Sequence, residues 1–220
     1  MKDRLLAAAR PVCQRYALAL VGGDASRAHG LTEHSVEILR LATAADVPLY
    51  DVTDAVVRAF EEAGLEARVA EAGPRAALLE VGCLPEVEPV EVELLKEALQ
   101  EPPVELGGVL VAALPDVAGL RMRDLHERGL PADILDVAAV SHLYGFRELE
   151  ALGRVHTEDF STGELLMRLE FVDSMDFAGV AEERVDEIRR FAEAWVEDIK
   201  LRRAEEGDID VDVPDLPSLD

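Results

Sequence analysis

The segment from Gly22 to His34 is the densest cluster of polar residues in the chain. It combines two glycines with a carboxylate, a hydroxyl, a guanidinium group and two imidazoles, and it precedes a predicted helix with Thr32 as its N-cap. Free N–H groups at a helix N-terminus favour an anion, so a phosphate or carboxylate could bind here, with Arg27 pairing its charge and His29 transferring a proton. The candidate catalytic residues are Asp24, Arg27, His29 and His34. The competing interpretation is an ordinary junction between two helices, where such residues are common.

The signatures of several known sites are absent from this sequence. No Gly-Lys-Ser or Gly-Lys-Thr follows the paired glycines, and the third glycine of a dinucleotide-binding fingerprint is missing. No serine lies in the G-x-S-x-G context of an exposed nucleophile. His29 and His34 are five residues apart, so they would not share a helix face as zinc ligands do. We therefore predict no metal ligands, and no cofactor can be identified from the sequence.

Four aspartates cluster loosely in the middle of the chain, at Asp116, Asp124, Asp133 and Asp136. Carboxylates are the ligands that hard divalent cations prefer. These four would bind such an ion only if the fold brought them together.

The longest periodic signal lies near the C-terminus. Apolar residues recur there at spacings of three and four, which places them on one stripe of a helix predicted from about Asp176 to Glu205. At a rise of 1.5 Å per residue this helix is roughly 45 Å long, longer than a domain of this size is wide. Part of the stripe would then pack against another chain, the alternative being the protein's own core. The predicted contact residues are Phe177, Val185, Ile188, Trp195 and Ile199.

The rest of the sequence predicts short elements. A β-hairpin is predicted over residues 66–82, with Gly73 and Pro74 at its turn, and one further strand over 109–114. Apolar stripes with start and stop residues predict helices over 3–9, 32–45, 50–63, 90–99, 117–128, 132–143 and 161–169. Residues 15–21 fit a helix end or a short strand, and 165–172 fit a strand as an alternative to the last of these helices. The expected fold class is α+β and helix-dominated, with a short hairpin, one or two further strands and a long C-terminal helix.

The length and the net charge of the chain limit its domain organisation and its partners. Its 220 residues suit a single helix-rich globular domain over 1–207, with a candidate internal boundary near 101–108, followed by a disordered acidic tail over 208–220. The formal net charge of -24 opposes a broad grip on a phosphate backbone, so nucleic acid is not an expected partner. The sequence has no Asn and few Lys, which favours a heat-adapted organism, such as an archaeon, with a salty cytoplasm; a GC-rich genome gives the same composition.

The cysteines and the apolar runs bear on the compartment. Cys13 and Cys83 are far apart and have no CxxC partner, so we predict buried free thiols, with a single bridge as the alternative. No long uncharged apolar run or secretory signal is present in the sequence. We therefore expect a cytoplasmic protein without a membrane partner.

Two functions follow from these patterns. The first is a non-catalytic accessory, assembly or adaptor protein that forms a homo-oligomer or binds a protein partner through its C-terminal helix. The second is a small-molecule hydrolase or transferase that binds an anionic substrate at the Asp24 to His34 loop. The sequence favours the first, because no catalytic constellation is complete. An exposed apolar patch would support the adaptor, and polar groups that converge in a pocket would support the enzyme.

Overall fold

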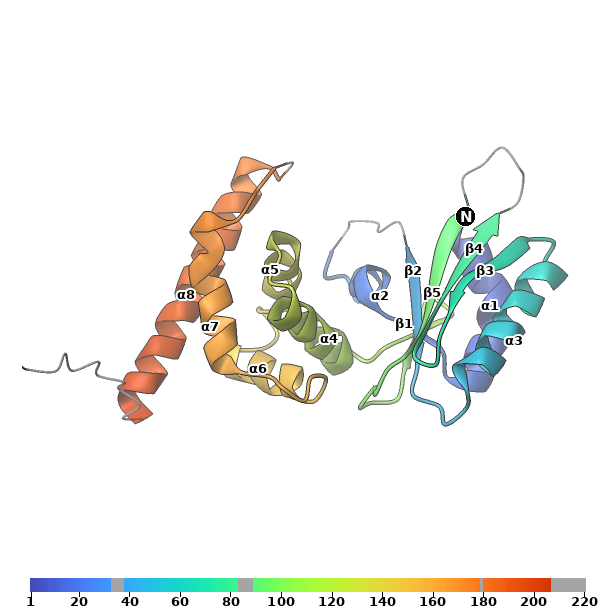
Figure 1. The fold of residues 1–220 in the computed structure, drawn as a ribbon, viewed down its shortest axis with the longest axis horizontal. Helices are drawn as coiled ribbons and strands as arrows, with labels where there is room; N and C mark the ends of the chain where they lie inside the picture. The colour runs from blue at the N-terminus through green and yellow to red at the C-terminus, as the bar shows by residue number, and fades with distance from the viewer. Residues whose placement is uncertain (33–37, 83–88, 179, 207–220) are drawn as a thin grey trace, which may run out of the picture.

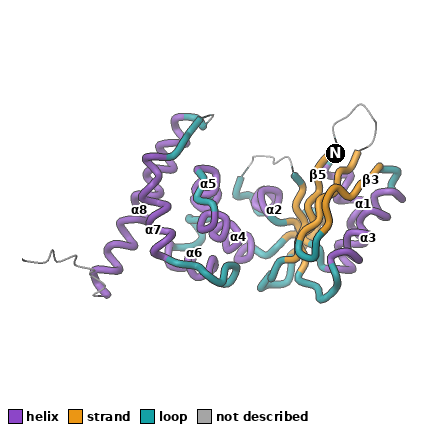
Figure 2. Tube along the Cα trace, viewed as in Figure 1, coloured by secondary structure: helices purple, strands orange, loops and turns teal. Residues whose placement is uncertain are grey.

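The computed structural model describes residues 1–32, 38–82, 89–178 and 180–206, and these form two packed parts. A β-sheet flanked by helices makes up the N-terminal half, and helices make up the C-terminal half (Figure 1 and Figure 2). Each part has its own cluster of buried apolar side chains. None of the described helices combines the length and the apolar character that a membrane crossing requires.

Three helices and seven strands make up the described part of the N-terminal half. Its elements in chain order are α1 (Lys2–Tyr16), β1 (Ala19–Leu20), α2 (Gly22–Ala28), β2 (Leu39–Thr43), α3 (Leu49–Glu62), β3 (Glu66–Ala72), β4 (Ala76–Gly82), β5 (Val90–Lys96), β6 (Val104–Leu106) and β7 (Val109–Val111). The strands form one sheet in the order β3-β4-β5-β2-β1-β7-β6. β2 pairs parallel to β5 and β1 parallel to β7, while the other neighbours are antiparallel. The sheet is therefore mixed.

The two faces of the sheet have different neighbours. Leu39 and Leu41 on β2, and Val92 and Leu94 on β5, are buried in the cluster that includes Phe60 of α3. Because side chains alternate along a strand, the residues between them point to the opposite face. Helices α1 and α3 cover the first face, and α2 lies on the other side, between the sheet and the C-terminal helices (Figure 1).

The predicted helix-dominated α+β class with only a short hairpin is wrong, because the chain builds a seven-stranded mixed sheet. Residues 39–43, predicted as part of a helix, form β2, and the helix predicted over 90–99 is replaced by β5. Spacings of three and four near Ile38 mimicked a helical stripe, although Leu39 and Leu41 also alternate as in a strand. Pro89 fits a helix start and a strand start equally well, and only pairing across the sheet separates the two.

Other local predictions are confirmed. The hairpin over 66–82 is β3 and β4, and the helix over 50–63 is α3, with Val52, Val56 and Phe60 buried. A helix does follow Ser161, whose Oγ accepts a hydrogen bond from the backbone N–H of Glu164 at 3.3 Å. Residues 15–21 contain both alternatives, since α1 runs to Tyr16 and β1 follows it. The predicted tail over 208–220 lies outside the described residues.

The C-terminal half is helical. Its elements are α4 (Leu114–Glu127), α5 (Pro131–Ala138), α6 (Phe146–Arg154), α7 (Thr162–Glu170), the 3-10 helix η1 (Phe171–Ser174) and α8 (Glu182–Glu206). Helix α8 packs against α5 and α7, while α4 packs against α6. The long C-terminal helix is thus confirmed, although it starts at Glu182 and not near Asp176.

Trp195 of α8 lies at the centre of the helical core. Its ring is fully buried, stacks on Phe146 at 4.8 Å between ring centroids, and meets Phe191 edge-on at 5.6 Å. Ile188 and Ile199, on the same stripe, are also buried. The stripe is therefore covered by helices of its own chain, and it does not need a second copy to bury it.

The remaining residues of the predicted contact, Phe177 and Val185, are half-buried. The guanidinium group of Arg189 lies over the Phe177 ring at 5.4 Å. The predicted apolar contact surface is thus mostly internal, while self-association itself stays a prediction.

We expect Trp195→Ala to lower the free energy of unfolding by about 3–5 kcal/mol, because it leaves a cavity among packed aromatic rings. The matched control is Leu201→Ala on the same helix, whose side chain is 61% exposed and should change stability by less than about 0.5 kcal/mol. Denaturant unfolding followed by circular dichroism measures both. Equal effects of the two substitutions would contradict the central packing role of Trp195.

Candidate functional site

The predicted catalytic residue Asp24 lies on α2 and is almost fully buried. Its Oδ2 accepts a hydrogen bond from Nζ of Lys2 on α1 at 2.6 Å. Its Oδ1 is 3.5 Å from Nη2 of Arg27 and has no hydrogen-bond partner. Asp24 therefore links α2 to α1 through Lys2. Its Oδ1 is the carboxylate oxygen that can still accept a hydrogen bond.

The predicted residue His29 does not contact Asp24. Nε2 of His29 is 2.9 Å from the carbonyl oxygen of Ala112, so this nitrogen donates its proton to the backbone next to β7. With Nε2 held in this bond, Nδ1 is the ring nitrogen that is left to accept a proton. His34 lies outside the described residues. The Arg27 side chain is 46% exposed.

The structure brings a different pair of charged residues to this region. Arg40 of β2 and Glu93 of β5 are register partners, and both point away from the α1 and α3 face. Nε of Arg40 donates to Oε2 of Glu93 at 2.6 Å. The two side chains are 36% and 30% exposed, so the pair remains accessible to solvent.

Gly22 at the start of α2 lies directly beside Arg40. Its φ of 66° is in the left-handed region, which favours glycine. A Cβ at this position would be 3.5 Å from Cδ of Arg40. The backbone N–H of Val21 also donates to the carbonyl oxygen of Arg40 at 3.1 Å. The first turn of α2 is therefore held next to Arg40 on β2.

A second guanidinium group reaches α2 from the helical half. Nη2 of Arg121, on α4, donates to Oγ of Ser26 at 3.3 Å, and Ser26 in turn donates to the carbonyl oxygen of Gly22 at 3.3 Å. Nη1 of Arg121 pairs with Asp136 at 2.8 Å, and its buried Nε has no hydrogen-bond partner. Burial raises the pKa of the neighbouring Asp124, 4.0 Å from Arg121, above its usual value.

Arg40 and Arg121 thus approach α2 from two halves of the molecule. Guanidinium groups bind phosphate and carboxylate oxygens through paired hydrogen bonds, which makes this arrangement suited to an anion. Sequence reasoning missed both residues. Arg40 interrupts a run of buried residues on β2, and Arg121 lies between Leu120 and Met122 of a mostly buried helix. A charged residue within an apolar segment is unusual, so each arginine could have been singled out from the sequence as a candidate site residue.

A divalent metal ion does not fit the described part of this region. Enzymes that transfer phosphoryl groups commonly use such ions, held by carboxylates. In the described ranges, no three His, Cys, Asp or Glu side chains lie close enough to share a metal ion. Glu93, which lies on this face of the sheet, is already paired with Arg40.

Three of the four aspartates of the middle segment are neighbours that pair with arginines: Asp124 and Asp133 share Arg128, and Asp124 and Asp136 share Arg121. Asp116 accepts the backbone N–H groups of Gln100 and Glu101, at 2.8 and 3.0 Å. Asp133 accepts the N–H of Leu130 at 3.1 Å and caps α5. Asp136 pairs with Arg121.

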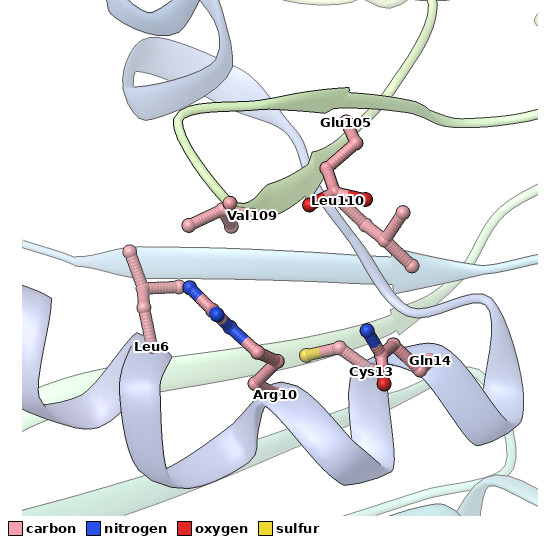
Figure 3. Close-up of a pocket in the computed structure, with 8 residues that line it drawn as sticks. Leu6, Arg10, Cys13, Gln14, Glu105, Val109 and Leu110 are labelled. Carbon is pink, nitrogen blue, oxygen red and sulfur yellow. The ribbon is translucent and has the colours of Figure 1, made fainter.

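A small cavity beneath the sheet is not a ligand site (Figure 3). It lies between α1 and the β6–β7 hairpin, and its volume of about 10 Å³ admits no more than about one water molecule. Burial raises the pKa of Cys13, which lines it, to about 11, so the thiol is protonated at neutral pH. This confirms the predicted buried free thiol for Cys13, while Cys83 lies outside the described residues.

A larger cavity of about 440 Å³ lies between the carboxyl end of β5 and helix α4. Arg123 lines it and forms two hydrogen bonds of 2.8 Å with the carboxylate of Glu97. His156 lies 3.2 Å from Asp116, and desolvation lowers the pKa of this imidazole despite the nearby carboxylate. The positive charge of Arg123 in this cavity is therefore already neutralised by Glu97.

Solved structures resemble this fold at low sequence identity. JHP933 from Helicobacter pylori matches with a TM-score of 0.57 and 12% identity, over 94% of this chain and 95% of that one. A putative nucleotidyltransferase from H. pylori matches with a TM-score of 0.53 and 14% identity, over 91% and 95%. The nucleotidyltransferase toxin MenT4 from Mycobacterium tuberculosis H37Rv matches with a TM-score of 0.56 and 16% identity, over 94% and 89%. No family model and no curated protein matches the sequence.

These likenesses extend over nearly the whole chain, so both the sheet and the helical half belong to the shared fold. Two of the three structures are described as nucleotidyltransferases, which conflicts with the predicted protein-interaction adaptor.

We expect Arg40→Gln to change the free energy of unfolding by less than about 1 kcal/mol, because ion pairs this exposed contribute little. The denaturation midpoint of the variant, compared with that of the unchanged protein, checks this. A much larger loss would mean that the pair serves stability and not binding.

Proposed function

We propose that the protein is a transferase that binds a nucleoside triphosphate at the first turn of α2, between Arg40 and Arg121. The observation that carries the proposal is the presence of these two guanidinium groups on either side of Gly22 and Ser26. The fold shared with nucleotidyltransferase structures supports the class of substrate. A triphosphate carries several negative charges, and two arginines from different elements can contact it together.

Each residue has a distinct role in this proposal. Gly22 supplies the left-handed backbone conformation of the turn beside Arg40, and the Arg40 side chain binds phosphate oxygens once it releases part of its bond to Glu93. Ser26 and Asp136 orient Arg121 from two sides, so that its planar group is held in place before substrate binds. Asp24 acts only by fastening α2 to α1.

The reaction is the transfer of a nucleotidyl group to an acceptor hydroxyl. The hydroxyl oxygen forms a bond to the α-phosphorus, the bond from that phosphorus to the bridging oxygen breaks, and pyrophosphate leaves with the electron pair. The proton of the hydroxyl passes to water. Arginine side chains stabilise the negative charge that builds up on the phosphoryl oxygens, and they need no reorientation when they are already fixed.

Calorimetric titration with ATP, GTP, CTP and UTP tests binding. We expect at least one to bind, and Arg40→Gln to weaken it by about tenfold or more, since a charge-assisted contact is lost. The control is Arg58→Gln, an exposed residue of α3 on the opposite face of the sheet. Release of labelled pyrophosphate then tests turnover. Failure of all four nucleotides to bind, or equal weakening by both substitutions, would refute the proposal.

A separate prediction concerns chelation. Because the positive charge assigned to this site comes from arginines, nucleotide affinity in excess EDTA should stay within about threefold of its value in magnesium. The same calorimetric titration, repeated in both buffers, measures this. Loss of binding on chelation would instead assign a divalent ion to the bound state.

A further inference from the structure

Another cavity, of about 400 Å³, lies in the helical half and is lined mainly by arginines. It receives side chains from α6, from the start of α7 and from the last turns of α8, with none from the sheet. Its lining residues are Arg147, Glu150, Arg154, Thr162, Ile199, Arg202 and Arg203. Four guanidinium groups and a single carboxylate therefore surround it, in a chain whose formal net charge is -24.

The single carboxylate, Glu150, is buried and is fully used by the protein. It accepts hydrogen bonds from Nε1 of Trp195 at 3.1 Å and from both Nη atoms of Arg202. Thr162 donates to it at 3.4 Å, and Arg154 lies 3.5 Å away. Glu150 thus orients Arg202 and Arg154 toward the cavity, and its charge offsets only part of theirs.

The other two arginines have no such partner. Within the described ranges, neither Arg147 nor Arg203 forms an ion pair. Arg147 is exposed on α6, and Arg203 is half-buried on α8. Because Asp198 also pairs with Arg202, at 2.8 Å, the four guanidinium groups keep a net charge of about two, which attracts an anion.

The start of α7 adds to this charge. Nη2 of Arg203 lies 3.2 Å from the position that a Cβ on Gly163 would occupy, so the guanidinium group covers the first turn of α7. Nη2 of Arg154 donates to Oγ1 of Thr162 on the same turn at 2.9 Å. Guanidinium groups from two helices therefore converge at the positive end of a third.

We propose that this cavity binds a phosphate group carried by a ligand, in a site separate from the one on α2. Phosphate is favoured over a carboxylate because it offers three or four oxygens to the four guanidinium groups, whereas Glu150 already occupies the place of a carboxylate. The volume is in the range of small-molecule sites. The inference does not rest on the proposed transferase activity, because none of these residues belongs to that site.

Trp195 provides a direct readout, since it is the only tryptophan of the chain and its indole N–H bonds to Glu150 in the wall of the cavity. We expect titration with pyrophosphate, or with a short single-stranded oligonucleotide, to change Trp195 fluorescence and to saturate. Binding of pyrophosphate alone would assign the site to a small phosphorylated molecule. Binding of the oligonucleotide alone would assign it to a phosphodiester.

The double variant Arg147→Gln/Arg203→Gln removes the two unpaired charges without breaking an ion pair of the described structure, so it should fold normally. We expect the affinity of this variant for the probe that binds to fall by about tenfold or more. Arg58→Gln/Arg190→Gln, which changes the net charge equally at exposed positions outside the cavity, should leave the affinity unchanged. Absence of saturable binding by either probe, or equal weakening in both double variants, would overturn the proposal. Circular dichroism of each variant establishes that it is folded.

Discussion

The in-register parallel pairing of β2 with β5 is the constraint on which the rest of the structure depends. It runs from Leu39 opposite Val92 to Thr43 opposite Lys96. Parallel strands require a crossover, which α3 and the β3–β4 hairpin supply, and this crossover builds one side of the sheet. A shift of one residue would exchange the two faces, exposing Leu39 and burying Arg40. The register therefore decides both the core and the position of the charged pair.

Helix α4 connects that sheet to the helical half. Near its start, Asp116 accepts two backbone N–H groups from the segment after β5, and further along Arg121 reaches Ser26 on α2. Buried polar contacts of this kind are directional, so they set the orientation of one half against the other more narrowly than apolar packing does. The approach of Arg121 to the first turn of α2 follows from this orientation.

The net charge of the whole chain does not predict the charge of a local site. The net charge of -24 predicts repulsion of anions over long distances, yet solvent and salt screen exposed acidic groups beyond about 10 Å. Guanidinium groups gathered by the fold act at contact distance. Arg40 lies beside Gly22, and Arg202 and Arg203 lie beside α6 and α7, although these partners are far apart in the sequence.

The sequence by itself determined the elements whose signals are local. The α3 stripe with its stop at Gly64, the hairpin turning at Gly73 and Pro74, the Ser161 cap and the long C-terminal helix all depend on residues within a few positions of one another. It also pointed to the glycine-rich segment that forms α2. Tertiary structure alone decided that residues 39–43 and 90–96 are strands, because short apolar runs fit either state until a neighbouring strand accepts their hydrogen bonds. It likewise decided that Trp195 is internal and that Arg40 and Arg121 meet at α2, since contacts between distant residues exist only once the chain has packed.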